Sequence, residues 1–480
     1  MPKLIDRTSE VAALRALTKR RKPALALLYG RRRVGKTFLL DHAWPKEQRV
    51  FYFLAADTTP DQNRIELLDE LSRWSSRQLD PNDYRSWRNV FRLFVDLAEQ
   101  GSLVVVLDEF QYLMGTGDDI VSHLVAVWDR ELKDRPLTLV LSGSQVATME
   151  RLERGDGPLY GRPDWVGKLR PFDYRDAARM IPRRTLRDAA TLFGIFGGTP
   201  RYLAVIEPRD TIASRTMSSM LSTTGAVHIQ LANLIEQEKG IRDTAEYRAV
   251  LTAVAAGWTL TDEIANAAGL GGRLHVVQRA LQILEDLGLV ERERNFSASE
   301  RTPWRARICD NAVSFWHRFV LPNRSRLERG KVSDVWKTSV APALDTYMGK
   351  VFEGMARQAY TRYHEDWDLP GDQAWARWEG QDRNRRSIEL DIVASLGDGR
   401  TLLGEIKWSS KPVGPELHSQ LLRNIEDLAN SGQKWAHDAV RPDGALYIYY
   451  SAAGFTDGFD SVARKDSRVR LITLQDMYGA

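Results

Sequence analysis

Apolar and polar positions divide the chain into segments with different periods. Four runs in the first third are apolar throughout, as expected for strands of a parallel sheet that is covered on both faces. They are residues 24–29 (ALALLY), 50–55 (VFYFLA), 102–107 (SLVVVL) and 137–142 (LTLVLS). Helical spacing separates these runs, so the pattern predicts an α/β nucleotide-binding core over residues 1–170.

Beyond this core the spacing changes. Residues 171–244 predict a helical lid, interrupted by GGTP at 197–200 because glycine and proline break helices. Residues 245–308 read helix, turn, helix and then a β-ribbon with a long loop, the order of a winged helix. Residues 309–340 predict a connector, and residues 341–480 a mixed α/β domain. The predicted fold class is therefore α/β, with a parallel-sheet core, a lid, a winged helix and a second α/β domain.

Length and composition narrow the class of protein. The chain has 480 residues, 43% hydrophobic and 28% charged, as in globular proteins with more than one domain. Its apolar runs are shorter than the roughly 18 residues of a membrane span, and its N-terminus has no apolar signal region, so a cytoplasmic protein is expected. The single Cys309 excludes an intrachain disulfide. A pI near 9.0 permits nucleic-acid binding without requiring it.

A phosphate-binding loop is predicted at GRRRVGKT, residues 30–37. Gly30 is followed after four residues by Gly35, Lys36 and Thr37, directly after a predicted strand and at the start of a helix. In such a loop backbone N–H groups hold phosphates, the lysine contacts the β- and γ-phosphate oxygens, and the hydroxyl binds Mg²⁺. The alternative is a glycine-rich turn without a ligand. The spacing predicts ATP and Mg²⁺ as cofactors.

Polar residues follow two further predicted strands. Asp108 would hold Mg²⁺ through water, and Glu109 would polarise the attacking water, unless both are solvated strand-end carboxylates. Ser142 and Ser144 could sense the γ-phosphate, although serine is also an ordinary turn residue. Arg162 in GPLYGRPDW is a candidate arginine finger, with a surface arginine as the alternative. If Arg162 acts in a neighbour's site, the chain forms a homo-oligomer.

A hairpin is predicted in the last domain, in the sequence IELDIVASLGDGRTLLGEIKW. If its loop is residues 397–399, Asp391 faces Glu405, Glu389 faces Lys407, and all four share one face. Opposed carboxylates destabilise a sheet unless a cation lies between them, and Lys407 and a metal ion would supply it. A two-residue turn would instead move Asp391 and Glu405 to opposite faces. An amphipathic hairpin with a solvated face also remains open.

The arrangement of Asp391 followed by Glu405-x-Lys407 resembles the metal site of PD-(D/E)xK nucleases. In that family two carboxylates bind Mg²⁺ and the lysine positions or activates the attacking water. The resemblance implies Glu353, on the first helix of the domain, as a further ligand, and Gln420 as a weaker correspondence. It also implies Mg²⁺, or Mn²⁺ in its place, as the metal.

The resemblance extends over nearly the whole chain. The motifs, in order, are GRRRVGKT, DEFQYL, LSGS, PLYGR, GGTPRYL, FWHRFV, YMGKVFE, ELDIVA and GEIKW. They resemble the archaeal-type P-loop ATPases of the extended AAA/STAND group with a DEXX-box C-terminal domain. The resemblance implies an ATPase core with a helical lid, a winged helix and a C-terminal restriction-endonuclease-like domain. It also implies an adenine-side motif, IDRTSEV, with Arg7 and Glu10.

DNA binding would fall on the predicted winged helix. Its candidate contacts are basic side chains of the recognition helix and the wing: Arg273, Arg279, Arg292, Arg294 and Arg305. Residues 241–300 hold more acidic than basic side chains, so a structural role between domains is the alternative.

The sequence thus predicts an ATP-hydrolysing, DNA-acting protein whose nucleotide state controls a Mg²⁺-dependent nuclease, in DNA processing or defence. The rival interpretation is a nucleotide-switched DNA-binding regulator or scaffold with an inactive nuclease fold. A third is an ATP-driven remodeller or defence sensor that oligomerises on a trigger. No membrane partner is expected.

Overall fold

The computed structural model describes residues 4–20, 22–115, 119–132, 135–181, 184–236, 244–299 and 302–479. The chain divides into two compact units, one up to Pro171 and one from Phe172 onward. Among the described residues no helix has both the length and the apolar character to cross a membrane.

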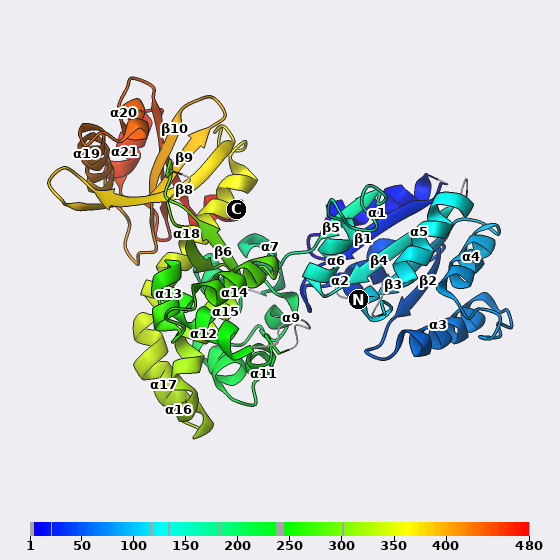
Figure 1. Cartoon of the computed structure of the whole chain (residues 1–480). Coiled ribbons are helices and arrows are strands. Elements are labelled where there is room, and N and C mark those ends of the chain that lie inside the picture. Colours follow the sequence, from blue (N-terminus) through cyan, green and yellow to red (C-terminus); the bar gives the residue numbers. More distant parts are fainter. Residues whose placement is uncertain are drawn as a thin grey trace. The chain divides into compact units, whose positions relative to one another are not determined.

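The first unit is a five-stranded parallel sheet with helices on both faces (Figure 1). Its strands are β1 (Ala24–Tyr29), β2 (Arg49–Leu54), β3 (Leu103–Asp108), β4 (Leu137–Gly143) and β5 (Trp165–Lys168), in the order β2-β3-β4-β1-β5. The four predicted strands are confirmed within a residue or so, and β1, β3 and β4 are buried along their whole length. Strand β5, which the apolar pattern did not predict, is the edge beside β1.

Two hydrophobic clusters hold helices against the two faces of this sheet. The helices are α1 (Thr8–Lys19), α2 (Lys36–Ala43), α3 (Pro60–Ser75), α4 (Trp87–Ala98), α5 (Asp119–Glu131) and α6 (Val146–Glu153). Helices α1 and α2 pack on one face through Leu14 and Leu39. Helices α3 to α6 pack on the other through residues such as Leu67, Phe94 and Val121. Burial of these side chains removes them from water and stabilises the unit.

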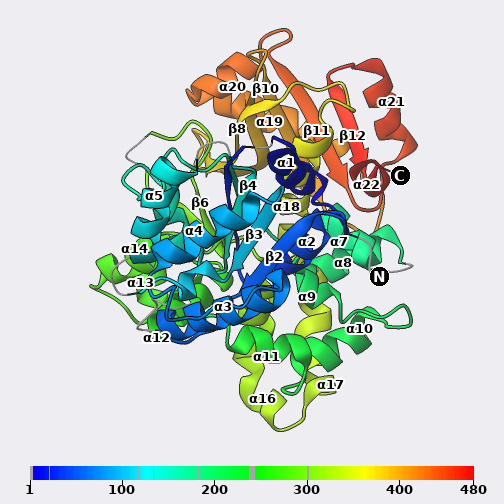
Figure 2. The same cartoon turned by 90° about the vertical axis from the view of Figure 1, so that its right-hand side faces the viewer.

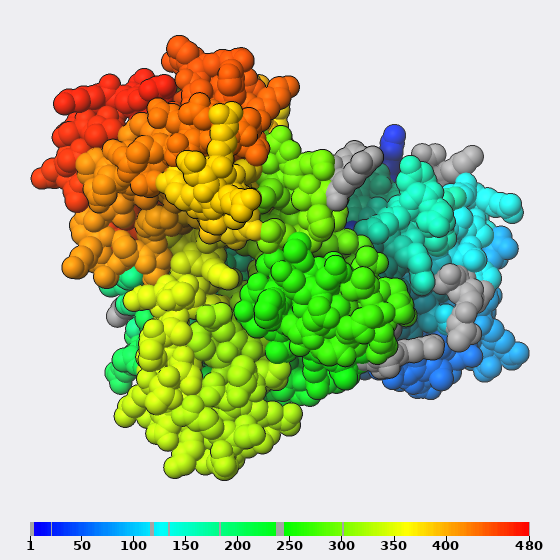
Figure 3. Space-filling model, turned by 60° about the vertical axis from the view of Figure 1, so that its left-hand side comes forward, coloured from blue at the N-terminus to red at the C-terminus, as the bar shows by residue number. Residues whose placement is uncertain are grey.

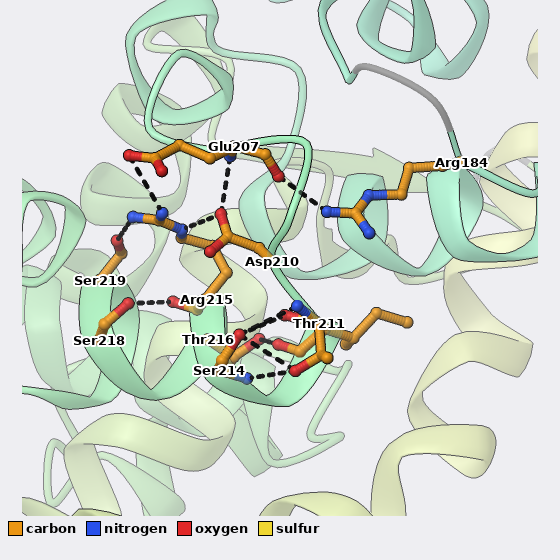
Figure 4. Close-up of polar contacts among 10 residues, drawn as sticks. Arg184, Glu207, Asp210, Thr211, Ser214, Arg215, Thr216, Ser218 and Ser219 are labelled. Carbon is orange, nitrogen blue, oxygen red and sulfur yellow. Dashed lines mark hydrogen bonds and ion pairs between the residues drawn. The ribbon is translucent and has the colours of Figure 1, made fainter.

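The second unit begins with short helices. They are α7 (Tyr174–Met180), α8 (Leu186–Phe196), α9 (Pro200–Leu203), α10 (Ile212–Arg215), the π-helical η2 (Thr216–Leu221) and α11 (Ala226–Ala232). The GGTP sequence separates α8 from α9, as predicted. Figure 4 shows how the turn before α10 is fixed: Arg215 pairs with Asp210 at 2.6 Å, and Arg184 donates to the carbonyl of Glu207 at 2.8 Å.

Three helices and a hairpin follow. They are α12 (Thr244–Ala255), α13 (Thr261–Ala267), α14 (Leu274–Asp286), β6 (Val290–Glu293) and β7 (Arg305–Ile308). The two strands pair antiparallel, so the predicted ribbon is present, but three helices rather than the predicted two precede it. A run of short helices then leads to the last domain: α15 (Asn311–Phe315), η3 (Trp316–Val320), η4 (Leu321–Asn323), α16 (Arg324–Glu328), α17 (Val332–Val335), η5 (Trp336–Val340) and η6 (Ala341–Ala343).

The chain ends in a second, mixed sheet (Figure 2). Its elements are α18 (Leu344–Tyr363), β8 (Asp372–Gln381), β9 (Ser387–Leu396), β10 (Thr401–Lys407), α19 (Glu416–Asn430), α20 (Lys434–Ala439), β11 (Ala445–Ser451), α21 (Asp457–Lys465), β12 (Val469–Thr473) and α22 (Leu474–Tyr478). The strand order is β12-β11-β10-β9-β8. Strands β8 to β10 form an antiparallel meander, whereas β10, β11 and β12 are parallel.

Aromatic contacts place helices on both faces of this sheet. Tyr449 of β11 packs on Phe459 of α21, with ring centroids 4.9 Å apart. Its neighbour Tyr450 contacts Trp367, just beyond α18. Because successive strand residues point to opposite faces, α21 and the end of α18 lie on opposite sides of β11.

Candidate functional site

The predicted phosphate-binding loop connects β1 to the N-terminus of α2. Gly35 caps α2 in the left-handed conformation, with φ of 96°. The Lys36 ammonium lies inside the loop and donates to the carbonyls of Gly30 at 2.9 Å and Arg31 at 3.3 Å. The loop therefore presents a helix N-terminus and a buried cation to the same space, which suits the phosphates of a nucleotide.

The two residues predicted to hold Mg²⁺ contact each other. Thr37 Oγ1 donates to Asp108 Oδ2 at 3.0 Å, at the end of β3. Tyr52 of the neighbouring strand β2 donates to the same oxygen. Burial and the Asp108 carboxylate raise the pKa of Tyr52, so its hydroxyl stays a donor. Sequence reasoning missed Tyr52, whose only signal is a hydroxyl within an apolar strand.

Glu109 is the centre of a second polar group. Its carboxylate accepts from Ser144 Oγ at 2.5 Å and from the Gln111 amide. Strand β4, which ends just before Ser144, lies between β3 and β1, so it brings Ser144 to the same edge of the sheet as the loop and Asp108. Ser142 is fully buried and its hydroxyl has no hydrogen-bond partner among the described residues. Ser144, rather than Ser142, is therefore the serine beside Glu109.

Two predicted nucleotide-site arginines have protein partners. Arg162 forms a two-pronged ion pair with Asp129 of α5, at 3.1 and 2.8 Å. That pair would have to open before Arg162 acted as an arginine finger, whose role stays a prediction. Arg7 lies 3.5 Å from Glu10 and donates to the carbonyl of Arg170 at 2.5 Å. Its place on the adenine side likewise stays a prediction.

The hairpin of the second sheet has the register predicted for a three-residue loop. Leu396 N donates to Arg400 O at 2.9 Å, and the pairing continues to Gly404 opposite Ile392. Beyond that pair, Asp391 uses its carboxylate, and not its backbone, to accept the N–H of Ile406 at 2.9 Å. The pairing of the two strands therefore ends where the acidic side chains begin.

Lys407 joins the two carboxylates at this point. Its Nζ lies 2.6 Å from Glu405 Oε2 and 3.2 Å from Asp391 Oδ2. The predicted cation between the opposed carboxylates is thus the lysine. Glu353 of α18 interacts electrostatically with Asp391. We refer to Glu353, Asp391, Glu405 and Lys407 as the carboxylate–lysine cluster.

The cluster carries an excess of negative charge. Burial, with Asp391 nearby, raises the pKa of Glu405 to about 7 and that of Glu353 also to about 7. Burial opposes the charged form of Lys407, but Asp391 and Glu405 outweigh it and raise the pKa of the lysine. Partly buried carboxylates in excess of their cation are the donors that a hard divalent cation prefers. In this geometry the described residues nevertheless include no group of three His, Cys, Asp or Glu side chains arranged to hold a metal ion.

Two other residues expected near the cluster have different partners. Glu389 pairs with Arg377 of β8, and its side chain is 59% exposed. Gln420 bonds to Asn424 and Arg423 on its own helix.

Sequence reasoning also missed two residues beside Glu405. Tyr449 lies opposite Glu405 in β11, and His418 Nδ1 is 2.6 Å from the Tyr449 hydroxyl. No local pattern marks either residue, because α19 and β11 meet β10 only in the folded sheet.

Most of the arginines predicted to contact DNA are already paired. Arg273 lies 2.5 Å from Glu246 and Arg292 Nε 2.8 Å from Glu285. Arg305 pairs with Glu379 of β8, and the Arg294 guanidinium lies 4.0 Å from the ring centroid of Trp304. Arg279 is exposed on α14 and carries no recorded ion pair in the described part of the chain.

The β6–β7 hairpin contacts the edge of the second sheet. Phe296 N donates to Arg377 O at 3.0 Å, and Asn295 Nδ2 donates to Glu379 O at 2.7 Å. The Phe296 ring meets Trp435 of α20 edge-to-face. In the space-filling view the green surface of the helices runs without a break into the yellow and orange surface of the last domain (Figure 3). These contacts support the structural alternative for this segment.

Comparison with known proteins bears on both parts of the chain. Residues 4–206 match the family described as ATPase domains predominantly from Archaea. That range includes the loop, Asp108 and Glu109. Residues 4–206 therefore resemble the ATPase domains of this family. Residues 316–423 match a family of archaeal and bacterial proteins of unknown function, and this range contains the whole carboxylate–lysine cluster.

Individual relatives are distant. An uncharacterised protein of Methanocaldococcus jannaschii, MJECL04, is 24% identical over 411 residues, which cover 84% of this chain and 87% of that protein. The Walker-type ATPase PABY2304 of Pyrococcus abyssi is 22% identical, covers 66% of this chain and 96% of that chain, and has a TM-score of 0.49. The ORC1 protein of Aeropyrum pernix, solved in complex with DNA, is 17% identical, covers 68% and 95% respectively, and has a TM-score of 0.35.

Proposed function

We propose that this protein is an ATP-dependent, DNA-acting enzyme in which the nucleotide state of the ATPase domain controls a Mg²⁺-dependent nuclease of the PD-(D/E)xK type. The observation that carries the nuclease assignment is the carboxylate–lysine cluster. Lys407 lies within 3.2 Å of both Asp391 and Glu405, where the pairing of two strands ends.

The ATPase half follows from the loop and the two polar groups beside it. Lys36 and the N-terminus of α2 would bind the phosphates, and Thr37 and Asp108, which are hydrogen-bonded to each other, would hold Mg²⁺. Glu109 acts as the base that orients and polarises water, and Ser144 and Gln111 fix its carboxylate. Ser144, which bonds to Glu109, would be the residue that senses the γ-phosphate.

The nuclease half uses the second sheet. Asp391, Glu405 and Glu353 would hold Mg²⁺, which when bound supplies Lewis-acid polarisation of a phosphoryl oxygen and of water. The N–H of Ile406 fixes the Asp391 carboxylate at 2.9 Å. Lys407 balances the carboxylates and would orient the attacking water. A winged helix over residues 245–308 would bring DNA to this site, with Arg279 as the exposed candidate contact.

The test is cleavage of labelled linear, branched and single-stranded DNA with Mg²⁺ or Mn²⁺. Lys407→Ala and Asp391→Asn should each abolish cleavage while ATP hydrolysis continues. The matched control is Lys411→Ala, because Lys411 is an exposed lysine just beyond the same strand. Cleavage by the two cluster variants at the rate of the control would remove the nuclease assignment.

The alternative is a nucleotide-switched DNA-binding regulator or scaffold with an inactive nuclease fold. The observation that favours it is the ion pairing of Lys407 with both carboxylates, which leaves the cluster partly neutralised without a metal. Titration with Mn²⁺ separates the two functions, since a scaffold has no use for a metal at Glu405. Saturable binding that Glu405→Gln removes would exclude the scaffold.

A further inference from the structure

The ATPase family match and the compact units end at different places. The match runs to residue 206, whereas the first unit ends at Pro171. Helices α7, α8 and α9 therefore belong to the ATPase family region by sequence but to the second unit by structure.

On the first-unit side, the chain that leads out of β5 lies against the phosphate-binding loop. Leu169 N donates to Tyr29 O at 2.7 Å. A Cβ at Gly30 would lie only 2.3 Å from Leu169 O, so the first glycine of the loop and the exit of the unit touch. Arg7 donates a hydrogen bond to the carbonyl of the next residue, Arg170. A shift of the loop would therefore move this exit segment.

In the second unit, the first residue, Phe172, is in close backbone contact with Gly198. Phe172 N donates to Gly198 O at 2.8 Å. A Cβ at Gly198 would lie 1.8 Å from Phe172 O, a distance that no side chain tolerates. This close approach gives the physical reason for a glycine in the GGTP sequence.

Helix α7 is then fastened to α18, the helix that carries Glu353. Arg362 of α18 pairs with Asp176 at 2.9 Å and with Asp173. Tyr174 N donates to Gln358 Oε1 at 3.3 Å. Two ion pairs and a hydrogen bond therefore join α7 and its N-cap to α18.

Helix α8 contacts the segment that follows β10 through Arg187. Its guanidinium lies 4.2 Å from the ring centroid of Trp408, the residue after Lys407. It also donates to Ser409 O at 2.8 Å and lies 3.7 Å from Asp345.

Trp408 links this arginine to α18. It donates to Asp345 Oδ1 at 3.2 Å, and its ring contacts Phe352, the neighbour of Glu353, at 5.4 Å. Arg187 thus contacts both the segment after β10 and the start of α18. Strand β10 carries Glu405 and Lys407, and α18 carries Glu353.

We propose that Arg187 is a positioning residue of the carboxylate–lysine cluster, and that α7 and α8 carry the nucleotide state of the loop to that cluster. This inference rests on the proposed function and names its route of control. Nucleotide that moves the loop against Leu169 shifts α7 and α8, and Arg187 converts that shift into a change in the separation of β10 and α18. In this route, the contact that changes with nucleotide is the stacking of Arg187 on Trp408.

The test is hydrogen exchange on the full chain, with and without a slowly hydrolysed ATP analogue and Mg²⁺, followed in peptides spanning residues 402–412. In the wild type the nucleotide should change exchange there. Arg187→Met removes a cation–π contact and a charged hydrogen bond, so exchange should become about tenfold faster and no longer respond to nucleotide. Arg187→Lys, which keeps a cation over the indole, should restore part of the response.

The matched control is Arg357→Met, an exposed arginine on α18, which should behave as the wild type. An unchanged nucleotide response in Arg187→Met, or no response in the wild type, would overturn the proposal. Because exchange requires no cleavage, a wild type that responds to nucleotide but cuts no DNA would refute the nuclease and leave the coupling standing.

Discussion

Replacing Glu353 by glutamine should stabilise the protein at alkaline pH. The carboxyl of Glu353 has its pKa raised to about 7 from an ordinary 4.5, by burial and by Asp391. A shift of that size disfavours the ionised form by about 3 kcal/mol. The net shift already includes the attraction of the ionised form to Arg377 and Arg307, and a neutral amide of the same shape avoids most of the remaining cost, so we expect a gain of about 2 kcal/mol.

The sign of the pH dependence follows from the direction of the shift. Because the folded pKa is raised, the folded protein holds its proton to higher pH than the unfolded chain. The penalty is absent below the ordinary pKa of 4.5, grows as the pH rises to about 7, and is complete above it. Glu353→Gln should therefore raise the melting temperature by about 4 °C at pH 8, at about 2 °C per kcal/mol for a domain of this size, and hardly at all at pH 4.5.

The assay is thermal unfolding followed by circular dichroism at both pH values, with and without Mg²⁺. The control is Glu365→Gln, an exposed glutamate just beyond the same helix, which should change nothing. Mg²⁺ should stabilise the wild type more than Glu353→Gln, because the variant lacks one of the carboxylates. A variant that is equally destabilised at both pH values would show that Glu353 is a packing residue whose ionisation costs no stability.

Three further predictions test other contacts. Glu109→Gln should bind ATP normally but hydrolyse it about 100-fold or more slowly, in a steady-state phosphate-release assay; hydrolysis at the wild-type rate would contradict its role as the base. Burial and Arg248 lower the pKa of His317 to about 4, so the free energy of unfolding should fall by up to about 3 kcal/mol as the pH falls from about 6.5 to 4. In urea unfolding, His317→Gln should make this loss of stability with falling pH smaller; a pH dependence as steep as that of the wild type would contradict the prediction. Gly198→Ala should destabilise the second unit by several kcal/mol, measured by its urea midpoint, because its methyl group meets Phe172 O; a change below about 1 kcal/mol would contradict that contact.

Much of the fold could be predicted from local patterns. Continuous apolar runs gave the parallel strands, since a strand buried on both faces has no polar positions. The hairpin register could be predicted down to the 397–399 loop, and with it the meeting of Asp391, Glu405 and Lys407. In each case the deciding signal lies within one or two neighbouring elements.

The rest depends on contacts between residues far apart in the chain. Tyr52 meets Asp108, and Arg187 meets Trp408, only after folding, and no local spacing encodes either pair. The arginines of the β6–β7 hairpin illustrate the converse error. A sequence shows their positive charge but not that partners such as Glu379, many residues away, neutralise it.

We propose that nucleotide bound to the loop controls chemistry at the carboxylate–lysine cluster. The most direct measurement is the rate of Mg²⁺-dependent DNA cleavage with and without ATP, in the wild type, in Lys36→Ala and in Lys407→Ala. We expect ATP to change the rate in the wild type, Lys36→Ala to cleave at one rate regardless of ATP, and Lys407→Ala not to cleave. Cleavage that persists in Lys407→Ala, or an ATP response that survives in Lys36→Ala, would contradict the account.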